Sequence, residues 1–261
     1  MKKTLFALTA AIAATAVPGM AAAADEPAAS PLTFNVGVVT DYRYRGISQS
    51  RLKPALQGGA DYALPNGVYF GTWASTIKWI KDAGQIYSVD AGNTQFEWDF
   101  YGGYKGEIAK DVTYDVGGLY YFYPGNSFGN VPGGANANTF EIYGAVTYSV
   151  VTVKYSHALT NLFGNAGTKN SGYLDLSATF EVGPAIQLIP HEGYQRVAHS
   201  SDFSYTDYSF TVGKDFSGFF LSAAFVGADT KTIAGTKAYA SPANGTDLGK
   251  GALVVAVKKT F

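Results

Sequence analysis

The chain has 261 residues, no cysteine and a formal net charge of -1, and 15% of its residues are charged. This length suits one or two domains. The balanced charge excludes the basic surface that nucleic-acid binding requires. A chain without cysteine forms no disulfide, so its fold depends on hydrogen bonding and packing alone.

Residues 1–24 predict a secretory signal peptide. Two lysines precede an apolar, alanine-rich run at residues 5–17, and three alanines at residues 22–24 offer a small-x-small cleavage site. A membrane anchor is the alternative interpretation. Residues 25–32 are predicted to form a short flexible tail. No later apolar run approaches the length of a spanning helix.

The opening segment, residues 33–62, predicts two strands in which apolar and polar side chains alternate. The apolar face of the first strand is expected to carry Phe34, Val36, Val38, Thr40, Tyr42 and Tyr44. The polar faces carry Asp41, Arg43 and Arg45 in the first strand, and Gln57 and Asp61 in the second. Gly46 is expected to end the first strand, and the second follows Pro54.

Ten further strands are predicted along the chain. They are expected at residues 67–76, 94–104, 111–123, 139–148, 151–160, 172–182, 185–197, 206–215, 219–228 and 251–261. Pro190 predicts a bulge or an adapted edge in the strand at residues 185–197. Residues 78–93 are expected to be a long polar connection, and residues 105–110 a turn.

The predicted connections alternate between short turns and longer loops rich in Gly, Asn, Ser and Asp. This alternation, with an even number of strands and apolar-out, polar-in faces, is typical of an outer-membrane barrel. The sequence therefore predicts an all-β fold: one antiparallel transmembrane β-barrel of about 12 strands over residues 33–261, with short periplasmic turns and longer extracellular loops. A soluble β-sandwich or lipocalin-like barrel would share the alternation and is the alternative.

Several motifs carry a resemblance to a known family. They are D-Y-R-Y-R-G-I-S-Q-S at 41–50, P-A-L-Q-G-G-A-D-Y at 54–62, G-T-W-A-S at 71–75, the acidic-aromatic pattern at 97–104, and Y-D-V-G-G-L-Y-Y-F-Y-P-G at 114–125. This pattern resembles the TorF-type porin family of proteobacterial outer-membrane proteins over nearly all of the mature chain. The resemblance implies an outer-membrane barrel with a porin role and supplies no catalytic residues. Lys259, two residues before the terminal Phe261, departs from the usual apolar ending of a barrel.

The inward polar side chains have two interpretations, a charged constriction that selects solutes or an ion-pair network that fills the barrel. The predicted pore-lining residues are Asp41, Arg43, Arg45, Gln57, Asp61, Glu97, Asp99, Asp115 and Glu141. Lys154, Asp175, Glu181 and Asp207 are expected on the same face. About twelve strands predict a narrow or plugged lumen, because eight strands are filled by side chains and sixteen leave a channel.

The predicted function is a porin for passive diffusion of small hydrophilic solutes. A structural or adhesive barrel and an outer-membrane hydrolase are the alternatives. His157, His191 and His199 are predicted to be surface residues, and no serine lies in a G-x-S-x-G motif. We expect no catalytic residue, metal or cofactor. The expected partners are outer-membrane lipid, small hydrophilic solutes and the assembly machinery, with no nucleic acid; the oligomeric state is left open.

Overall fold

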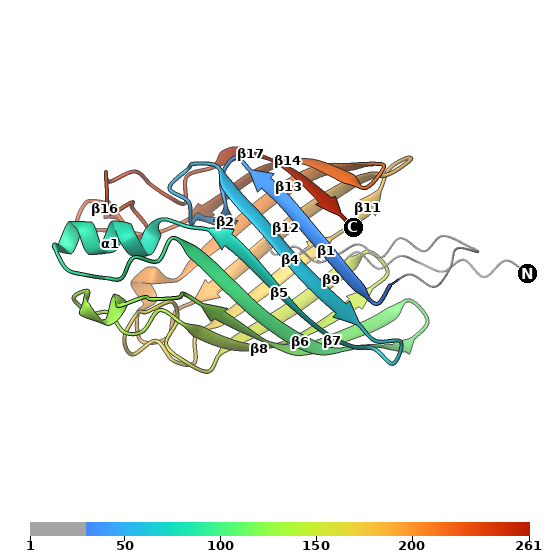
Figure 1. Cartoon of the computed structure of the whole chain (residues 1–261), viewed down its shortest axis with the longest axis horizontal. Helices are drawn as coiled ribbons and strands as arrows, with labels where there is room; N and C mark the ends of the chain where they lie inside the picture. The colour runs from blue at the N-terminus through green and yellow to red at the C-terminus, as the bar shows by residue number, and fades with distance from the viewer. Residues whose placement is uncertain (1–29) are drawn as a thin grey trace, which may run out of the picture.

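The computed structural model describes residues 30–261, which form a closed antiparallel β-barrel (Figure 1). The predicted signal peptide and residues 25–29 of the predicted tail lie outside this range. Twelve strands form the ring, and the last pairs with the first. In ring order they are β1 (Leu32–Val39), β4 (Ala55–Ala63), β5 (Val68–Thr76), β6 (Phe96–Ala109), β7 (Val112–Phe122), β8 (Thr139–Tyr148), β9 (Val151–Ala158), β10 (Gly172–Ala178), β12 (Ile186–Arg196), β13 (Tyr205–Phe216), β14 (Phe219–Asp229) and β17 (Ala252–Thr260).

The connections alternate in length as predicted. Five are tight turns at one end of the barrel, here called the turn end, where the carboxyl terminus also lies (Figure 1). Residues 217–218 show their geometry: Ser217 and Gly218 both have positive φ, 54° and 82°, as a two-residue hairpin turn that matches the strand twist requires. The six long connections meet at the opposite end, the loop end.

The long connections contain the remaining elements. These are β2 (Arg43–Tyr44), β3 (Ile47–Ser48), α1 (Trp79–Tyr87), the 3-10 helices at Phe128–Asn130 and Ser201–Phe203, β15 (Thr232–Ile233) and β16 (Thr236–Lys237). The two-residue β11 (Phe180–Glu181) continues β10 along β12. Within residues 30–261, no helix has the length and apolarity that crossing a membrane demands.

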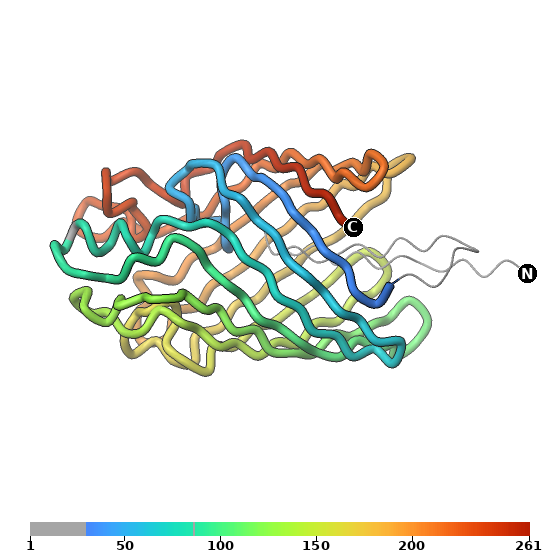
Figure 2. The backbone as a smooth tube through the Cα atoms, in the orientation of Figure 1, coloured from blue at the N-terminus to red at the C-terminus, as the bar shows by residue number. Residues whose placement is uncertain are grey.

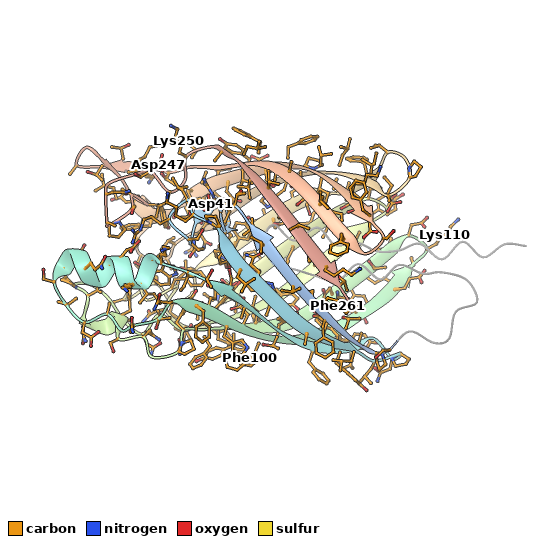
Figure 3. All side chains as sticks on the ribbon, turned by 45° about the horizontal axis from the view of Figure 1, so that its top comes forward. Asp41, Phe100, Lys110, Asp247, Lys250 and Phe261 are labelled. Atoms are coloured by element: carbon orange, nitrogen blue, oxygen red, sulfur yellow. The ribbon has the colours of Figure 1, made fainter. Side chains whose placement is uncertain are left out.

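The outer surface of the barrel is apolar, which confirms the predicted facing of the strands. Phe100 projects away from the wall in Figure 3. Large apolar side chains are exposed on every side of the ring, among them Phe34, Val36, Leu56, Phe70, Trp98, Ile142, Leu174, Leu176, Phe210, Leu221 and Val255. A water-soluble barrel would bury this face, so the soluble alternative is wrong.

Polar contacts cross the interior between strands that are not neighbours. The Tyr69 hydroxyl on β5 contacts the Tyr143 hydroxyl on β8 and lies 2.6 Å from Asp115 on β7. The Tyr101 hydroxyl on β6 donates to Asp61 on β4 at 2.5 Å. Such contacts reach across the strands in between along one face of the wall, which places these polar side chains together on the inner face.

Three interior tyrosines each lie flat across a glycine of a neighbouring strand. A Cβ atom placed on Gly103 would lie 2.6 Å from the Tyr69 hydroxyl, and one on Gly71 would lie 2.6 Å from the Tyr101 ring. Tyr143 covers Gly117 in the same way. Glycine inside a strand commonly marks such a close approach, and the ring covers backbone that glycine leaves bare.

Four details differ from the sequence predictions, two of them at strand ends. The first strand ends at Val39, so Tyr42 and Tyr44 leave the outer face and lie inside the barrel. Strand β6 continues through residues 105–109 and turns only at 110–111. The polar connection at residues 78–93 contains α1, whose Ile80 and Ala83 are buried beside Trp73 and Tyr123 in one apolar cluster.

Pro190 interrupts pairing on one side only. Strand β12 pairs with β13 in constant register from Ile186 to Gln195. On its other side the ladder stops at the Ser177–His191 pair and resumes, unshifted, at Phe180–Leu188. Proline has no N–H to donate there. Of the two predicted features, the bulge is wrong, because the register does not shift; the pairing is instead interrupted along one edge of β12.

Adjacent residues at mid-strand test which face meets lipid. Phe210 is exposed on the outside of β13, whereas Thr211 faces inward. We expect Phe210→Lys to lower the free energy of unfolding in lipid vesicles by about 2–4 kcal/mol relative to Phe210→Ala, because a lysine at mid-depth in lipid carries that cost. Thr211→Lys is the control and should cost less than half as much. Equal costs measured by urea titration would contradict the assigned faces.

A second prediction concerns the tyrosine-covered glycines. Gly103→Ala should lower the free energy of unfolding by about 1–3 kcal/mol, the usual cost of overpacking, because its Cβ would also lie 2.5 Å from the Val116 carbonyl oxygen. Gly144→Ala is the matched control, since the nearest atom to its Cβ is 3.9 Å away. Its effect should stay within about 0.5 kcal/mol. Indistinguishable denaturation midpoints would rule out this packing.

Candidate functional site

The connection at residues 40–54, here called the inserted loop, folds into the barrel (Figures 1 and 2). Thr40 is exposed, but from Asp41 to Ser50 only Tyr44 and Gln49 are more than marginally accessible. Its hairpin, β2–β3, turns at Arg45 and Gly46, both with positive φ, 45° and 77°. Arg45 therefore occupies the tip of a hairpin that points away from the strand that carries it.

Arg45 fixes the tip to the far side of the ring. Its guanidinium nitrogens lie 2.7 and 3.1 Å from the two carboxylate oxygens of Glu141 on β8, and 2.6 Å from the Gln195 side-chain oxygen on β12. The guanidinium also stacks over the Tyr173 ring, 4.1 Å from its centroid. A two-pronged arginine–carboxylate contact is both strong and directional, so it sets where the hairpin ends.

The base of the inserted loop is held by a second set of contacts. Arg43 pairs with Asp41 and donates to the backbone oxygens of Gly46 and Leu248, both at 2.9 Å. Ser48 also donates to Asp41. Because Asp41 neutralises Arg43, this pair adds no net charge to the interior. Figure 3 shows Asp41 at the loop end.

Tyr42 connects the loop to the near wall. Its hydroxyl donates to Glu97 on β6 at 2.5 Å, and the Tyr123 hydroxyl donates to the other Glu97 oxygen at the same distance. Burial, reinforced by the nearby Glu97 charge, raises the pKa of Tyr42 well above its ordinary value. The phenol therefore stays protonated and remains a donor.

Five inward carboxylates of the wall are buried at the level of the inserted loop. This carboxylate layer consists of Glu97, Asp99, Glu141, Asp175 and Asp207. Toward the turn end, inward side chains become half-buried: on β6, Glu97 and Asp99 are buried, whereas Tyr101 and Lys105 are partly accessible. The interior is thus closed in its loop-end half and accessible in its turn-end half.

His191 lies within this layer, so its predicted surface position is wrong. Its Nε2 is 2.8 Å from Asp175 and 3.1 Å from the Tyr173 hydroxyl, which itself donates to Asp207 at 3.0 Å. His191 Nδ1 is 3.8 Å from Asp207. The imidazole therefore lies between two carboxylates and is hydrogen-bonded to Asp175. His199 is exposed and His157 is half-exposed, as their surface prediction requires.

The structure places the nine predicted pore-lining residues inside the barrel. Asp41, Arg43 and Arg45 belong to the inserted loop rather than to the wall. Glu97, Asp99 and Glu141 belong to the carboxylate layer. Gln57 is half-buried near the loop end of β4, in the cross-strand row of Ser75 and Glu97. Asp61 and Asp115 are half-buried in the turn-end half, where Asp115 lies 3.7 Å from Lys105.

Sequence reasoning missed the interior aromatic and amide residues that join the inserted loop to the wall, two of them in the loop and three on the wall. These are Tyr42, Tyr44, Tyr121, Tyr173 and Gln195. Strand length was the available signal for the two loop tyrosines. A first strand from residue 33 to 45 would exceed the roughly 9–11 residues that a tilted strand needs to cross the hydrocarbon.

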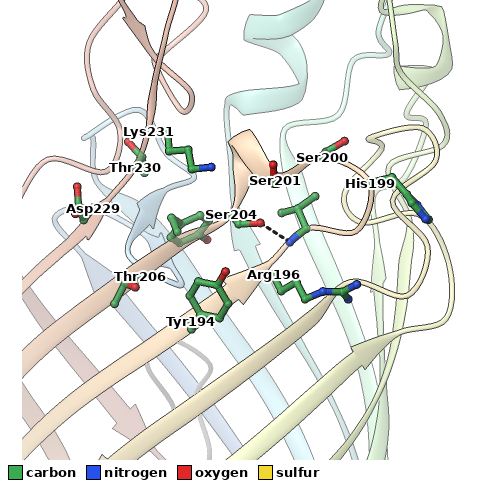
Figure 4. Close-up of a pocket in the computed structure, with 12 residues that line it drawn as sticks. Tyr194, Arg196, His199, Ser200, Ser201, Ser204, Thr206, Asp229, Thr230 and Lys231 are labelled. Carbon is green, nitrogen blue, oxygen red and sulfur yellow. Dashed lines mark hydrogen bonds between the residues drawn. The ribbon is translucent and has the colours of Figure 1, made fainter.

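A separate groove of about 650 Å³ lies at the loop end of β12, β13 and β14 (Figure 4). Tyr194, Thr206 and Asp229 form one cross-strand row of its lining. Tyr194 is exposed on the outer face, and the inward Gln195 beside it contacts Arg45. The groove therefore lies outside the wall and is not part of the lumen. Glu192 on the same outer face is a charged exception to the apolar surface.

Comparison with known proteins adds a family. Residues 22–261 match the family model Gcw_chp, described as a bacterial protein of unknown function. The chain belongs to the Gcw_chp family. A search of curated proteins returns no match for this Gcw_chp chain. The TorF-type name is not among these matches, so it stays a resemblance of the motifs.

Two solved porins share the fold of this Gcw_chp chain. The KdgM porin, in complex with disordered oligogalacturonate, superposes with a TM-score of 0.53 at 6% identity, covering 88% of this chain and 98% of its own. The NanC porin gives a TM-score of 0.52 at 10% identity over the same shares. Identities this low show a common fold and nothing about the solute.

The Arg45–Glu141 contact predicts how firmly the loop is held. Removing one partner of a buried ion pair typically costs about 3–5 kcal/mol, because the other charge stays buried and alone. Arg45→Ala should therefore loosen the inserted loop and let trypsin cleave the chain after Arg51 in the folded barrel. Lys250→Ala, at an exposed loop position, is the control and should leave cleavage within the inserted loop unchanged. Equal resistance of both variants would show that Arg45 does not anchor the loop.

Proposed function

We propose that this chain is an outer-membrane pore through which small hydrophilic solutes diffuse passively along a narrow polar lumen. The apolar exterior suits lipid, and the inward polar side chains suit water. The long loops would face outward and the tight turns the periplasm, as in other bacterial barrels. The predicted signal peptide supplies the export that this location requires, and the outer-membrane assembly machinery would insert the barrel.

One observation carries the proposal: the lumen is closed by a loop and not by the wall. The turn-end half is lined by accessible polar side chains such as Asp61, Lys105 and Asp115. Above it, the closure is made by residues 41–50, whose contacts with the wall are made by side chains such as Tyr42 and Arg45. Such a loop can move without breaking any pairing within the ring.

The shared fold of the KdgM and NanC porins and the TorF-type resemblance both support a porin role. The oligogalacturonate of the KdgM complex is not carried over, because the narrow part of this lumen carries buried carboxylates. The nine pore-lining residues are proposed to act on solutes through their charge and through the position of the inserted loop.

A hydrolase is the second candidate, and the buried Asp175–His191 contact at 2.8 Å is the observation that favours it. A histidine oriented by a carboxylate can act as a general base. A structural or adhesive barrel is the third class. A pore conducts ions, a hydrolase turns over substrate and a structural barrel does neither, so conductance and activity measurements on the purified protein separate the three candidates.

Planar-bilayer recording tests the proposal. We expect stepwise currents from the purified protein, and a several-fold larger single-channel conductance when residues 41–51 are replaced by a short Gly-Ser linker. Arg45→Ala should increase conductance or its fluctuations, and Lys250→Ala is the control that should match the parent protein. Silence of the parent and loop-shortened proteins would overturn the pore. Esterase or protease turnover would then favour the hydrolase, and its absence the structural role.

A further inference from the structure

The carboxylate layer is unevenly compensated. Glu141 is paired with Arg45, Asp175 contacts His191, and Asp207 accepts a hydrogen bond from the Tyr173 hydroxyl. Glu97 accepts hydrogen bonds from two phenols, which carry no charge. Arg43 is consumed by Asp41. The cations beside these five carboxylates are Arg45, His191 and Lys154, which lies opposite Asp175 on β9. The layer therefore holds more carboxylates than cations.

Asp99 is the least compensated carboxylate of the layer, and its side chain is only 1% accessible. Neither of its carboxylate oxygens has a hydrogen-bond donor within residues 30–261. Buried polar groups are nearly always hydrogen-bonded, and an isolated buried carboxylate is strongly unfavourable. Its cross-strand neighbours are the aromatic side chains of Trp73 and Tyr121, which provide no cation.

The unpaired Asp99 carboxylate lies at the boundary between the closed and the accessible halves of the lumen. It is the last buried inward residue of β6 before the wall becomes accessible at Tyr101. A solute that enters from the turn end therefore meets Asp99 where the lumen closes. A charge in a confined, low-dielectric passage acts on ions far more strongly than one in bulk water.

The turn-end half does not share this asymmetry. Its half-buried carboxylates, Asp61 and Asp115, are matched by two inward lysines, Lys105 and Lys258, whereas Lys154 lies opposite Asp175 at the carboxylate layer. Lys105 lies 3.7 Å from Asp115. In the closed, loop-end half of the barrel, by contrast, carboxylates outnumber cations.

We infer that the pore prefers cations and that Asp99 determines this preference, its carboxylate attracting a cationic solute at the entrance to the closed layer. The inference rests on the proposed pore function. Acidic side chains at a constriction favour cations in other channels. The solute class is small inorganic and organic cations, with neutral hydrophilic molecules passing and polyanions excluded.

Reversal potentials in a KCl gradient test this inference. We expect the parent protein to favour K⁺ over Cl⁻, and Asp99→Asn, which keeps the side-chain size, to lose most of that preference. Glu107→Gln is the matched control: it removes the same charge from β6 at an exposed position near the turn end, and it should keep the preference. Heat-dependent migration in detergent gels checks that each variant is folded.

The outcomes separate the two proposals. If the parent conducts too little for a reversal potential, the loop-shortened protein with and without Asp99→Asn replaces it. Currents without a K⁺ preference, or a preference that Asp99→Asn leaves intact, overturn the inference and leave the pore standing. Silence of both the parent and the loop-shortened protein overturns the pore and this inference with it.

Discussion

Ring closure is the constraint from which the rest of the structure follows. The first and last strands pair from Asn35–Thr260 to Val39–Ala256, and Phe34 and Phe261 exchange backbone hydrogen bonds at 3.2 and 2.9 Å. No strand of the ring is left with an unpaired edge. In hydrocarbon each unpaired backbone group would cost several kcal/mol, so closure makes an apolar exterior possible. It also encloses an interior space that either side chains and loops or water must occupy.

This barrel does both, in different halves. The inserted loop fills the loop-end half with a short hairpin whose tip arginine reaches the opposite wall. The turn-end half keeps accessible polar side chains. Burying so many ionisable groups is unfavourable unless each finds a partner, and most do, through Arg45, His191 and several phenols. The inserted loop and the buried ionisable side chains therefore lie in the same half of the barrel, where both can affect which solutes pass.

The sequence determines the strands and their faces because period-two alternation reports directly which side of a strand meets lipid. It also predicts the even strand number, the alternating connections and the tight turns. The inserted loop could not be found this way. Residues 41–45 alternate like a strand because they form a hairpin arm, and only contacts such as Arg45–Glu141, ninety-six residues apart, place that arm inside. His191 and α1 were missed for a similar reason, since tertiary packing decides their burial.

The tyrosines that lie across glycines have a consequence for the width of the passage. A phenol standing upright from the wall would extend inward by the length of its side chain, whereas Tyr69, Tyr101 and Tyr143 lie against bare backbone and intrude by about the thickness of a ring. The width of the turn-end half thus depends on the glycines over which these tyrosines lie. A larger residue in place of Gly71, Gly103 or Gly117 would push the covering tyrosine ring away from the wall. The passage would then become narrower without any change in its charged side chains.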